Sequence, residues 1–327
     1  MRCEPLSSQS RTRGASCVAL SVAEDSPADS WRASFSIGEI SFSIGGAGPY
    51  PVFGPQLELF RSRANSCDLE ISLEWIDRLY PPAGRLLFDS GAVWTLHQDG
   101  DGYLFDFASD VVGPEPYKRL HIDKEFRSGR LLLNRKYFPD SVPNGPLDYP
   151  LDELLVMHRL GRERGVEVHA AGIRDAKGNA YLFLGHSGAG KSTTTRLWNR
   201  LPGMTVLSDD RIILRQRRNT NGQPEIWMYG TPWHGEAAFA APEKARIERL
   251  FVIEHAPEHA PESEITPISG SIAVAEIMAR SFLPFHDAVA LENTMTFLQE
   301  MVAILPCYRL EFRPDITAVE VVQRFQS

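Results

Sequence analysis

The stretch Gly185–Thr195 reads GHSGAGKSTTT and follows the apolar run YLFL at Tyr181–Leu184. It fits the pattern G-x-x-x-x-G-K-[ST], in which backbone amides hold the phosphates of a nucleoside triphosphate at a helix N-terminus. The pattern requires a strand before the loop and a helix after it, and the flanking residues are typical of both. The stretch therefore predicts a triphosphate-binding loop inside a mixed α/β domain.

Each residue type in this loop has a physical role in holding phosphate. Glycines let backbone amides approach the phosphate oxygens, Lys191 would reach the β and γ phosphates, and Ser192 would ligate Mg²⁺. ATP and Mg²⁺ are thus the expected cofactors. The predicted nucleotide-binding residues are Gly185, His186, Ser187, Gly188, Ala189, Gly190, Lys191, Ser192 and Thr193.

Two further polar groups accompany the loop. VLSDD ends a short apolar strand at Asp209 and Asp210, 18 and 19 residues after Lys191 (209 − 191 and 210 − 191). Such acids can hold Mg²⁺ or accept a proton from an attacking hydroxyl, and a solvated turn is the alternative. His169 in VEVHAAG lies on a strand expected to pair with the loop strand through the turn RDAKGN. By itself it is either a core histidine or a catalytic one.

The His of VHAAG, then LGHSGAGKST, then LSDD, in this order and spacing, resemble the C-terminal domain of HPr serine kinase/phosphorylase and its relatives. That family shares a phosphoenolpyruvate carboxykinase-like P-loop fold. The resemblance extends from about Leu151 to the C-terminus. It implies catalytic roles for His169, Lys191 and Asp210, with Asp210 accepting the proton of the substrate hydroxyl. It also implies that Ser192 and Asp209 hold the metal.

The sequence departs from HPr kinase proper after the aspartate pair. HPr kinases carry a metal-holding glutamate in an E-x-R-G-like segment, whereas this chain reads EIWMYGTPWHGE, with no acid two or three residues before Gly230. The departure argues against phosphorylase activity and against the HPr carrier protein as substrate. The chain looks more like the divergent branch found beside peptide-modification genes, which includes lasso-peptide precursor kinases.

The resemblance implies a kinase that uses ATP and Mg²⁺ to phosphorylate a Ser or Thr hydroxyl on a peptide or small protein, a ribosomal peptide precursor being one such acceptor. Two alternatives stay open: a non-catalytic nucleotide-binding scaffold or regulator of a peptide-modifying complex, and a small-molecule kinase of the same fold. Members of the family commonly form oligomers, so the resemblance also implies that this chain forms a homo-oligomer.

Other polar residues allow two interpretations each. In the segment TPWHGE at 231–236, Trp233 and His234 would contact substrate or nucleotide, or be a packed Trp and a surface His. Arg211, and Arg246 and Arg249 on a predicted helix, would meet phosphates or be solvated surface charges.

The chain divides into three parts by pattern. We expect a disordered tail over residues 1–30, an antiparallel β-rich domain over 31–150, and the HPr kinase-like ATP-binding domain over 151–327. Short apolar runs, a repeated FSIG and the turn HQDGDGY indicate the β-rich part. Four prolines in 138–150 mark the boundary, and LDELLVMHRL predicts a helix packed on the second domain. Further helices are predicted at 241–250, 271–282 and 289–305.

Composition limits the class of partner and compartment. The net charge is −8, with Lys and Arg dispersed, which argues against a nucleic acid or an anionic membrane. The four cysteines show no C-x-x-C spacing, and no apolar run is long enough to span a membrane. We therefore expect free thiols and a cytoplasmic protein.

Overall fold

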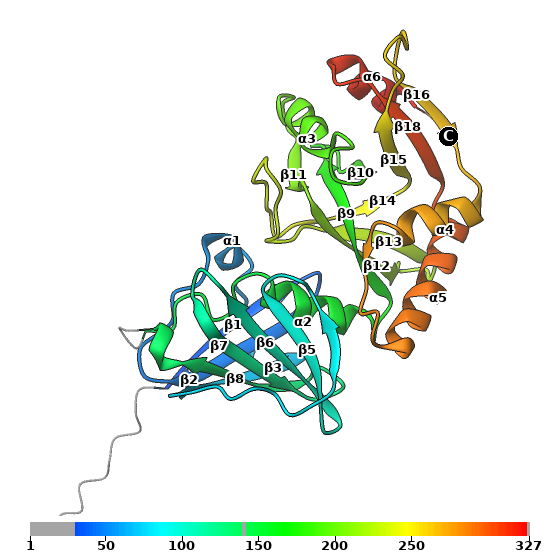
Figure 1. Cartoon of the computed structure of the whole chain (residues 1–327). Coiled ribbons are helices and arrows are strands. Elements are labelled where there is room, and N and C mark those ends of the chain that lie inside the picture. The colour runs from blue at the N-terminus through cyan, green and yellow to red at the C-terminus, as the bar shows by residue number, and fades with distance from the viewer. Residues whose placement is uncertain (1–29, 139–141, 326–327) are drawn as a thin grey trace, which may run out of the picture.

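The computed structural model of the chain describes residues 30–138 and 142–325, which form two β-sheets and their covering helices (Figure 1). The fold is mixed α and β with two sheets, as the sequence predicts. Ser30 begins the first strand, and the rest of the predicted tail lies outside the described residues. Within the described ranges, no helix is both long and apolar enough to cross a membrane.

The first sheet has eight strands in the order β1-β2-β3-β8-β7-β6-β5-β4. The two FSIG repeats pair directly, with Phe35 opposite Phe42, and the predicted hairpin turn joins β5 to β6 through Gly100 and Asp101. The elements of this unit are β1 (Ser30–Ile37), β2 (Ile40–Ala47), α1 (Pro55–Glu58), β3 (Leu69–Ile76), β4 (Leu86–Asp89), β5 (Trp94–Asp99), β6 (Gly102–Ser109), β7 (Gly113–Ile122), β8 (Ser128–Asn134) and a 3-10 turn (Arg135–Tyr137).

The prediction of a purely antiparallel first sheet is wrong. β3 runs parallel to both of its neighbours, β2 and β8. A parallel neighbour needs a long crossover connection, and residues 48–68, which include α1, provide it between β2 and β3. Strand direction depends on where this crossover returns to the sheet, and the alternation of apolar residues within a strand does not report that.

The helix α2 (Leu151–Leu160) forms where helical spacing predicts it, but it does not belong to the second unit alone. It touches β9 of the second sheet, yet its apolar side chains join the core of the first sheet. These side chains are Leu151, Leu154, Leu155, Val156 and Leu160. The helix therefore bridges the two units and is buried on nearly every side.

The second sheet has the order β14-β13-β12-β9-β10-β15-β18-β16, with β11 and β17 also pairing with β9. Its elements are β9 (Gly165–Arg174), β10 (Ala180–Leu184), α3 (Lys191–Asn199), β11 (Thr205–Ser208), β12 (Arg211–Arg218), β13 (Pro224–Tyr229), β14 (Lys244–Ile247), β15 (Leu250–His255), β16 (Glu264–Pro267), α4 (Gly270–Met278), β17 (Ser281–Phe282), α5 (Ala288–Ile304), β18 (Cys307–Phe312) and α6 (Ile316–Arg324).

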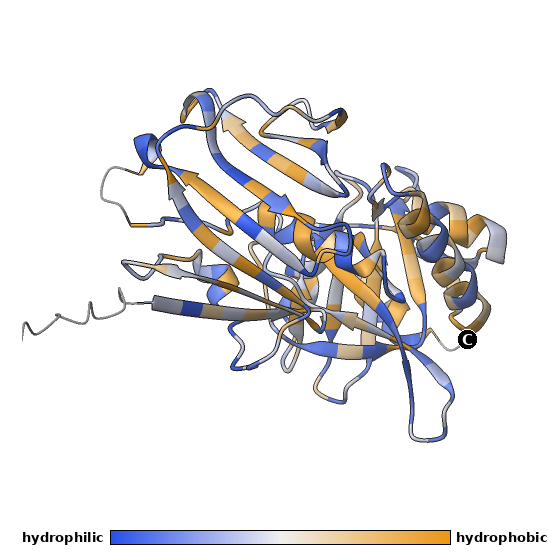
Figure 2. Cartoon of the chain, turned by 90° about the horizontal axis from the view of Figure 1, so that it is seen from below, coloured by the Kyte–Doolittle hydropathy of each residue, from blue (hydrophilic) through white to orange (hydrophobic). Residues whose placement is uncertain are grey.

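Helices cover both faces of the second sheet. Along β10, Leu182 and Leu184 pack with α4 and α5, whereas Phe183 packs with α3 and α6. Successive side chains of a strand point to opposite faces, and strands buried on both faces read as continuous apolar runs. Figure 2 shows such apolar stretches within the strands, in orange. The central strands are therefore held from two sides, which fixes the loops at their ends.

Residues 244–247 form the strand β14, so the helix predicted at 241–250 is wrong. β14 pairs with β13, and it buries Ala245 and Ile247 while Lys244 and Arg246 are exposed. The sequence APEKARIERL has too few apolar residues to distinguish a two-residue period from a helical one. The segment forms a strand because its backbone hydrogen-bonds to the edge of β13, which would otherwise be unpaired.

The turn between β1 and β2 fastens the two units together. Gly38, with φ of +58°, accepts a hydrogen bond from Arg215 Nη1 at 2.7 Å through its carbonyl. The carboxylate of Glu39 accepts one from the Tyr229 hydroxyl at 3.0 Å. Ile213 and Tyr229 are themselves part of the first core. The units therefore share apolar and polar contacts.

Candidate functional site

The predicted site residues gather where β9 changes partners. β9 pairs with β12 and β17 along its first half and with β10 and β11 along its second half. Because β10 and β11 are both antiparallel to β9, their last residues, Leu184 and Ser208, lie at the same end on either side of it. The glycine-rich loop follows Leu184, the aspartate pair follows Ser208, and His169 lies on β9 between them.

The glycine-rich loop, Gly185–Gly190, joins β10 to α3 in the predicted order of strand, loop and helix. Gly190 has φ of +101°, and a Cβ there would lie 3.0 Å from the Phe312 ring. A Cβ on Gly185 would meet neighbouring side chains at 2.9 Å. The loop needs glycine at both ends, for conformation at one and for space at both. Its tip, His186–Gly188, is exposed.

Lys191 begins α3, and its side chain folds back under the loop. Its Nζ donates to the carbonyl oxygens of Gly185 and His186, each at 3.0 Å. Burial lowers the pKa of this ammonium to about 8, although the nearby Asp210 carboxylate acts in the opposite direction. Ser192 follows in the first turn and is half-buried. The loop therefore holds a buried amine directly below its backbone.

His169 and Asp210 form a hydrogen-bonded pair beside the loop. His169 Nε2 lies 2.8 Å from Asp210 Oδ1, and the His169 carbonyl accepts from the Gly185 amide at 3.2 Å. Burial raises the pKa of Asp210, but the hydrogen bond to His169 and the charges of Arg211 and Lys191 hold this pKa below its ordinary value. Asp210 is thus an oriented, ionised carboxylate at neutral pH.

Asp209 makes different contacts from its neighbour. Its carboxylate is fully buried and accepts three backbone amides, from Gly235 at 3.1 Å, Ala237 at 2.9 Å and Phe239 at 3.2 Å. Glycine is needed at 235 because a Cβ there would lie 2.9 Å from Asp209 Oδ2. Asp209 holds the segment 235–239 in place. If Asp209 also held a metal ion, as the resemblance implies, the ion would have to bind carboxylate oxygens that already accept these hydrogen bonds.

Arg211 is not a solvated surface charge. Its Nε lies 2.9 Å from Glu153 Oε1 and 3.6 Å from Glu167 Oε1, and Nη1 pairs with Asp210. Its guanidinium carbon lies 4.1 Å from the centroid of the Phe282 ring. Burial and the Glu153 carboxylate raise the pKa of Glu167 well above its ordinary value. Residues of α2, β9 and β17 thus converge on one cation, a contact set that local sequence does not reveal.

The other two arginines have partners elsewhere in the second unit. Arg246 is an exposed residue of β14 and lies 3.6 Å from Glu225. Arg249 donates to the carbonyl of Phe325 at 2.5 Å. In the segment 231–236, Trp233 is buried and His234 is exposed, as the structural interpretation expects.

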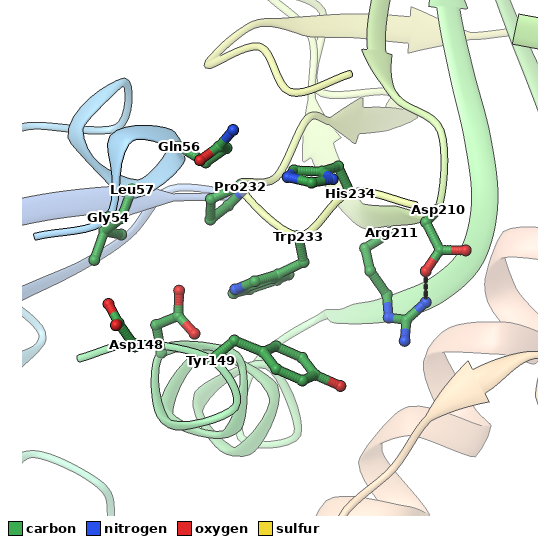
Figure 3. A pocket seen from close by; sticks show the side chains of 11 residues that line it. Gly54, Gln56, Leu57, Asp148, Tyr149, Asp210, Arg211, Pro232, Trp233 and His234 are labelled. Carbon is green, nitrogen blue, oxygen red and sulfur yellow. Dashed lines mark hydrogen bonds and ion pairs between the residues drawn. The ribbon is translucent and has the colours of Figure 1, made fainter. Parts of the chain in front are cut away.

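A cavity of about 590 Å³ lies between the two units, and Asp210 is part of its wall (Figure 3). The first unit contributes Gly54 and Gln56, and the second unit contributes Asp210 and Trp233. Asp148, just before α2, and Asp152, in the first turn of α2, also line it. In Figure 3 the Trp233 ring extends toward the side of Gly54 and Asp148, and Asp210 lies at the other end. Trp233 and His234 therefore line a cavity as well.

Sequence reasoning missed several residues around the site. His255, at the end of β15, has Nε2 2.7 Å from the Gly188 carbonyl oxygen and braces the loop tip. Burial raises the pKa of Asp152 to about 7. The sequence signal that could have pointed to Asp152 is its pairing with Glu153 at the start of a helix that is otherwise mostly apolar. Acids are also common in a first helical turn for electrostatic reasons, so the signal is ambiguous.

The arrangement brings a buried amine and an ionised carboxylate with its histidine partner close to a glycine-rich loop, and the carboxylate also lines a cavity. No family model matches this sequence, and a search of curated proteins finds no match to it. What the site can do therefore rests on its own residues and geometry.

Proposed function

We propose that this protein is an ATP- and Mg²⁺-dependent kinase that phosphorylates a Ser or Thr hydroxyl of a peptide or small protein, with an HPr kinase-like P-loop domain over 151–327. The observation that supports it most is the position of Asp210. This carboxylate is hydrogen-bonded to His169, interacts with Lys191 of the glycine-rich loop, and lines the cavity. A base that lines an acceptor cavity and lies near the amine below a donor loop suits phosphoryl transfer.

The glycine-rich loop and Lys191 would hold the triphosphate. Amides of the loop and the N-terminus of α3 suit anionic oxygens, and Lys191 can exchange its contacts with two loop carbonyls for contacts with phosphate. Positioning and charge neutralisation supply most of the catalysis in phosphoryl transfer. Lys191 therefore acts on the donor rather than on the acceptor.

Asp210 would act on the acceptor. The acceptor oxygen forms a bond to the γ-phosphorus, the bond from that phosphorus to the bridging oxygen breaks, and ADP leaves. The hydroxyl proton passes to the Asp210 carboxylate, which is ionised and therefore able to accept it. His169 fixes the orientation of this carboxylate through the 2.8 Å contact.

The residues present fit a Mg²⁺ ion that is held largely by phosphate. Mg²⁺ usually takes one or two protein oxygens and completes its shell with phosphate and water. Ser192 offers a half-buried hydroxyl in the first turn of α3, and Asp209 offers a carboxylate shared with three amides. The described residues hold no cluster of three or more potential ligands among His, Cys, Asp and Glu. Bound Mg²⁺ would neutralise phosphate charge.

Replacing Asp210 by Asn tests the proposal. The amide keeps the shape but cannot take the proton, so transfer of label from γ-labelled ATP to a mixture of Ser- and Thr-containing peptides should fall by at least ~100-fold. Binding of a fluorescent ATP analogue should stay near that of the wild type. Asp110→Asn, at an exposed turn, is the matched control and should change neither.

Unchanged turnover in Asp210→Asn would remove this mechanism. Label that stays in ATP, or appears only as free phosphate with every acceptor, would argue against a kinase. The second candidate is then a non-catalytic nucleotide-binding scaffold. One observation favours it: Asp209, the acid expected to hold metal, is occupied by three backbone hydrogen bonds.

A further inference from the structure

The cavity between the units has an acidic wall that is distinct from Asp210. Asp152 is buried in this wall, where its carboxylate accepts the amide of Glu153 at 2.8 Å and lies near the Trp233 indole. Asp148 is exposed at the cavity, and its carboxylate forms no hydrogen bond or ion pair with any described residue. Two carboxyl groups therefore face one cavity with little to neutralise them.

Of the side chains that the structure describes, the nearest cationic ones do not form ion pairs with these two carboxyl groups. Arg211 is already paired with Glu153 and Asp210. Lys118 is buried behind the wall, where its Nζ contacts the backbone carbonyls of Pro146 at 3.5 Å and Asp148 at 3.4 Å. In the part of the chain that the structure describes, it forms no ion pair with either cavity aspartate. Neither carboxyl group of the cavity wall therefore has an ion-pair partner among the described residues.

Trp233 is the second unmatched group. The side chain is only 6% exposed, and its indole Nε1 meets no acceptor with good hydrogen-bond geometry among the described residues, although it lies close enough to the Asp152 carboxylate to lower the pKa of that group. Buried N–H groups are normally satisfied, so a ligand carbonyl is the expected acceptor. The ring points toward the side of Gly54 and Asp148, and an aromatic face attracts a cation. The acids and the indole therefore both favour a ligand with a cationic group and a carbonyl.

We propose that this cavity is the acceptor subsite and takes an extended peptide segment in which a Lys or Arg side chain lies against Asp152, Asp148 and Trp233 while a neighbouring hydroxyl reaches Asp210. The inference rests on the proposed kinase function and adds the substrate class, a Ser or Thr beside a cationic side chain. A cavity of about 590 Å³ has the size of an ordinary ligand site. Gly54 and Gln56 line the same cavity, which gives the first unit a part in substrate selection.

A cationic ligand also suits the protonation of the wall. Burial raises the pKa of Asp152 to about 7, since no charge compensates its carboxylate fully. A cation placed beside the carboxylate favours its ionised form and gains an ion pair in a partly dry site. A neutral glutamine in the same position gains no such pair.

Short capped peptides test the inference, each with one Ser and either Lys, Arg or Gln at a single flanking position. Binding would be measured by fluorescence anisotropy with a non-hydrolysable ATP analogue, and transfer with γ-labelled ATP. At the best flanking position, the Lys or Arg peptide should bind at least ~10-fold tighter than its Gln counterpart, about 1.4 kcal/mol.

Asp148→Asn and Asp152→Asn should each reduce this preference several-fold, whereas Asp110→Asn should leave it unchanged. The exposed Asp148 makes no described side-chain bond, so its variant should fold normally even if the buried Asp152 variant does not. Trp233→Phe removes the N–H and leaves a weaker aromatic face, so it should weaken all three peptides, and the Lys and Arg peptides more than the Gln peptide.

The outcomes separate the two proposals. Equal binding of Lys, Arg and Gln peptides at every position, failure of all peptides to bind, or a preference that survives both aspartate variants would overturn the subsite. A cation preference in binding without any transfer would keep the subsite and remove the kinase. Transfer without a cation preference would keep the kinase and remove the subsite.

Discussion

At the scale of the residue, two adjacent aspartates have separate tasks. Asp209 is fully buried and holds three amides, whereas Asp210 pairs with His169 and reaches the cavity. The sequence predicts that both acids belong to the site, but their neighbours decide which carboxylate is available. Asp210 differs because its partners are the side chains of His169 and Arg211 and not backbone amides.

Asp152 provides a residue-scale prediction. Its pKa is about 7 in the folded chain against 3.8 ordinarily, so the folded state binds more protons between these values. The stability that this proton contributes is present at low pH and lost as pH rises through about 7. Asp152→Asn does not titrate, so its stability relative to wild type should rise from pH 5 to pH 8, by on the order of 2 kcal/mol.

Urea unfolding of both proteins at pH 5 and pH 8 measures this difference. Asp110→Asn removes an exposed carboxylate and should track the wild type. Identical pH dependence of wild type and Asp152→Asn would show that Asp152 has no raised pKa in the folded chain.

At the scale of the element, the glycine-rich loop depends on its conformation as much as on its amides. Gly190→Ala places a Cβ 3.0 Å from Phe312 at a φ of +101°, so the loop must shift. Affinity for ATP should fall at least ~10-fold, in addition to a loss of about 1–2 kcal/mol in stability. Calorimetric titration with ATP measures the first, and urea unfolding the second.

Gly222→Ala is the matched control for this loop. Gly222 also has positive φ, +77°, but a Cβ there meets nothing within 4 Å. It should lose a similar stability and keep its ATP affinity. Equal ATP affinity in the Gly190 and Gly222 variants would mean that the loop tolerates a side chain and that its shape does not matter for ATP.

The segment 235–239 should likewise depend on one carboxylate. Asp209→Ala leaves three amides without their acceptor, which should cost about 3 kcal/mol in the free energy of unfolding. Proteases should cut this segment faster in the variant. Asp209→Asn keeps one acceptor oxygen and should lose less. Equal cleavage rates in wild type and Asp209→Ala would contradict the assigned role.

At the scale of the whole molecule, the two units are not independent. Ile213, Tyr229 and Trp233 of the second unit are buried in the first core, and α2 contributes its apolar side chains there too. A fragment of residues 151–327 would expose these side chains to water. We expect it to aggregate or to bind ATP poorly, as measured by size-exclusion chromatography and by titration.

The chain from Ser30 onward is the control for this fragment, because it keeps every contact described here. It should remain dispersed and bind ATP like the full chain. If the fragment 151–327 were monomeric and bound ATP with full affinity, residues 151–327 would be a domain that folds without the first unit.

Local patterns determined much of this protein. Strand and helix periods, the hairpin at Gly100 and the order of strand, loop and helix around Lys191 can be predicted because each depends on residues close in sequence. The structure also pairs His169 with Asp210, two residues that the family resemblance singles out. The strand β14 was not predicted, because the spacing of its apolar residues fits a helix as well as a strand. Its pairing with β13 makes it a strand.

Tertiary structure decided the rest, since it depends on residues far apart in the chain. Only packing of the units brings Gly54, Asp148 and Trp233 around one cavity, and only the crossover at 48–68 makes β3 parallel to its neighbours. Burial then sets the charge of Asp152 and the hydrogen bonds of Asp209. A sequence states which groups are present, but their desolvation and their partners arise only when distant segments meet.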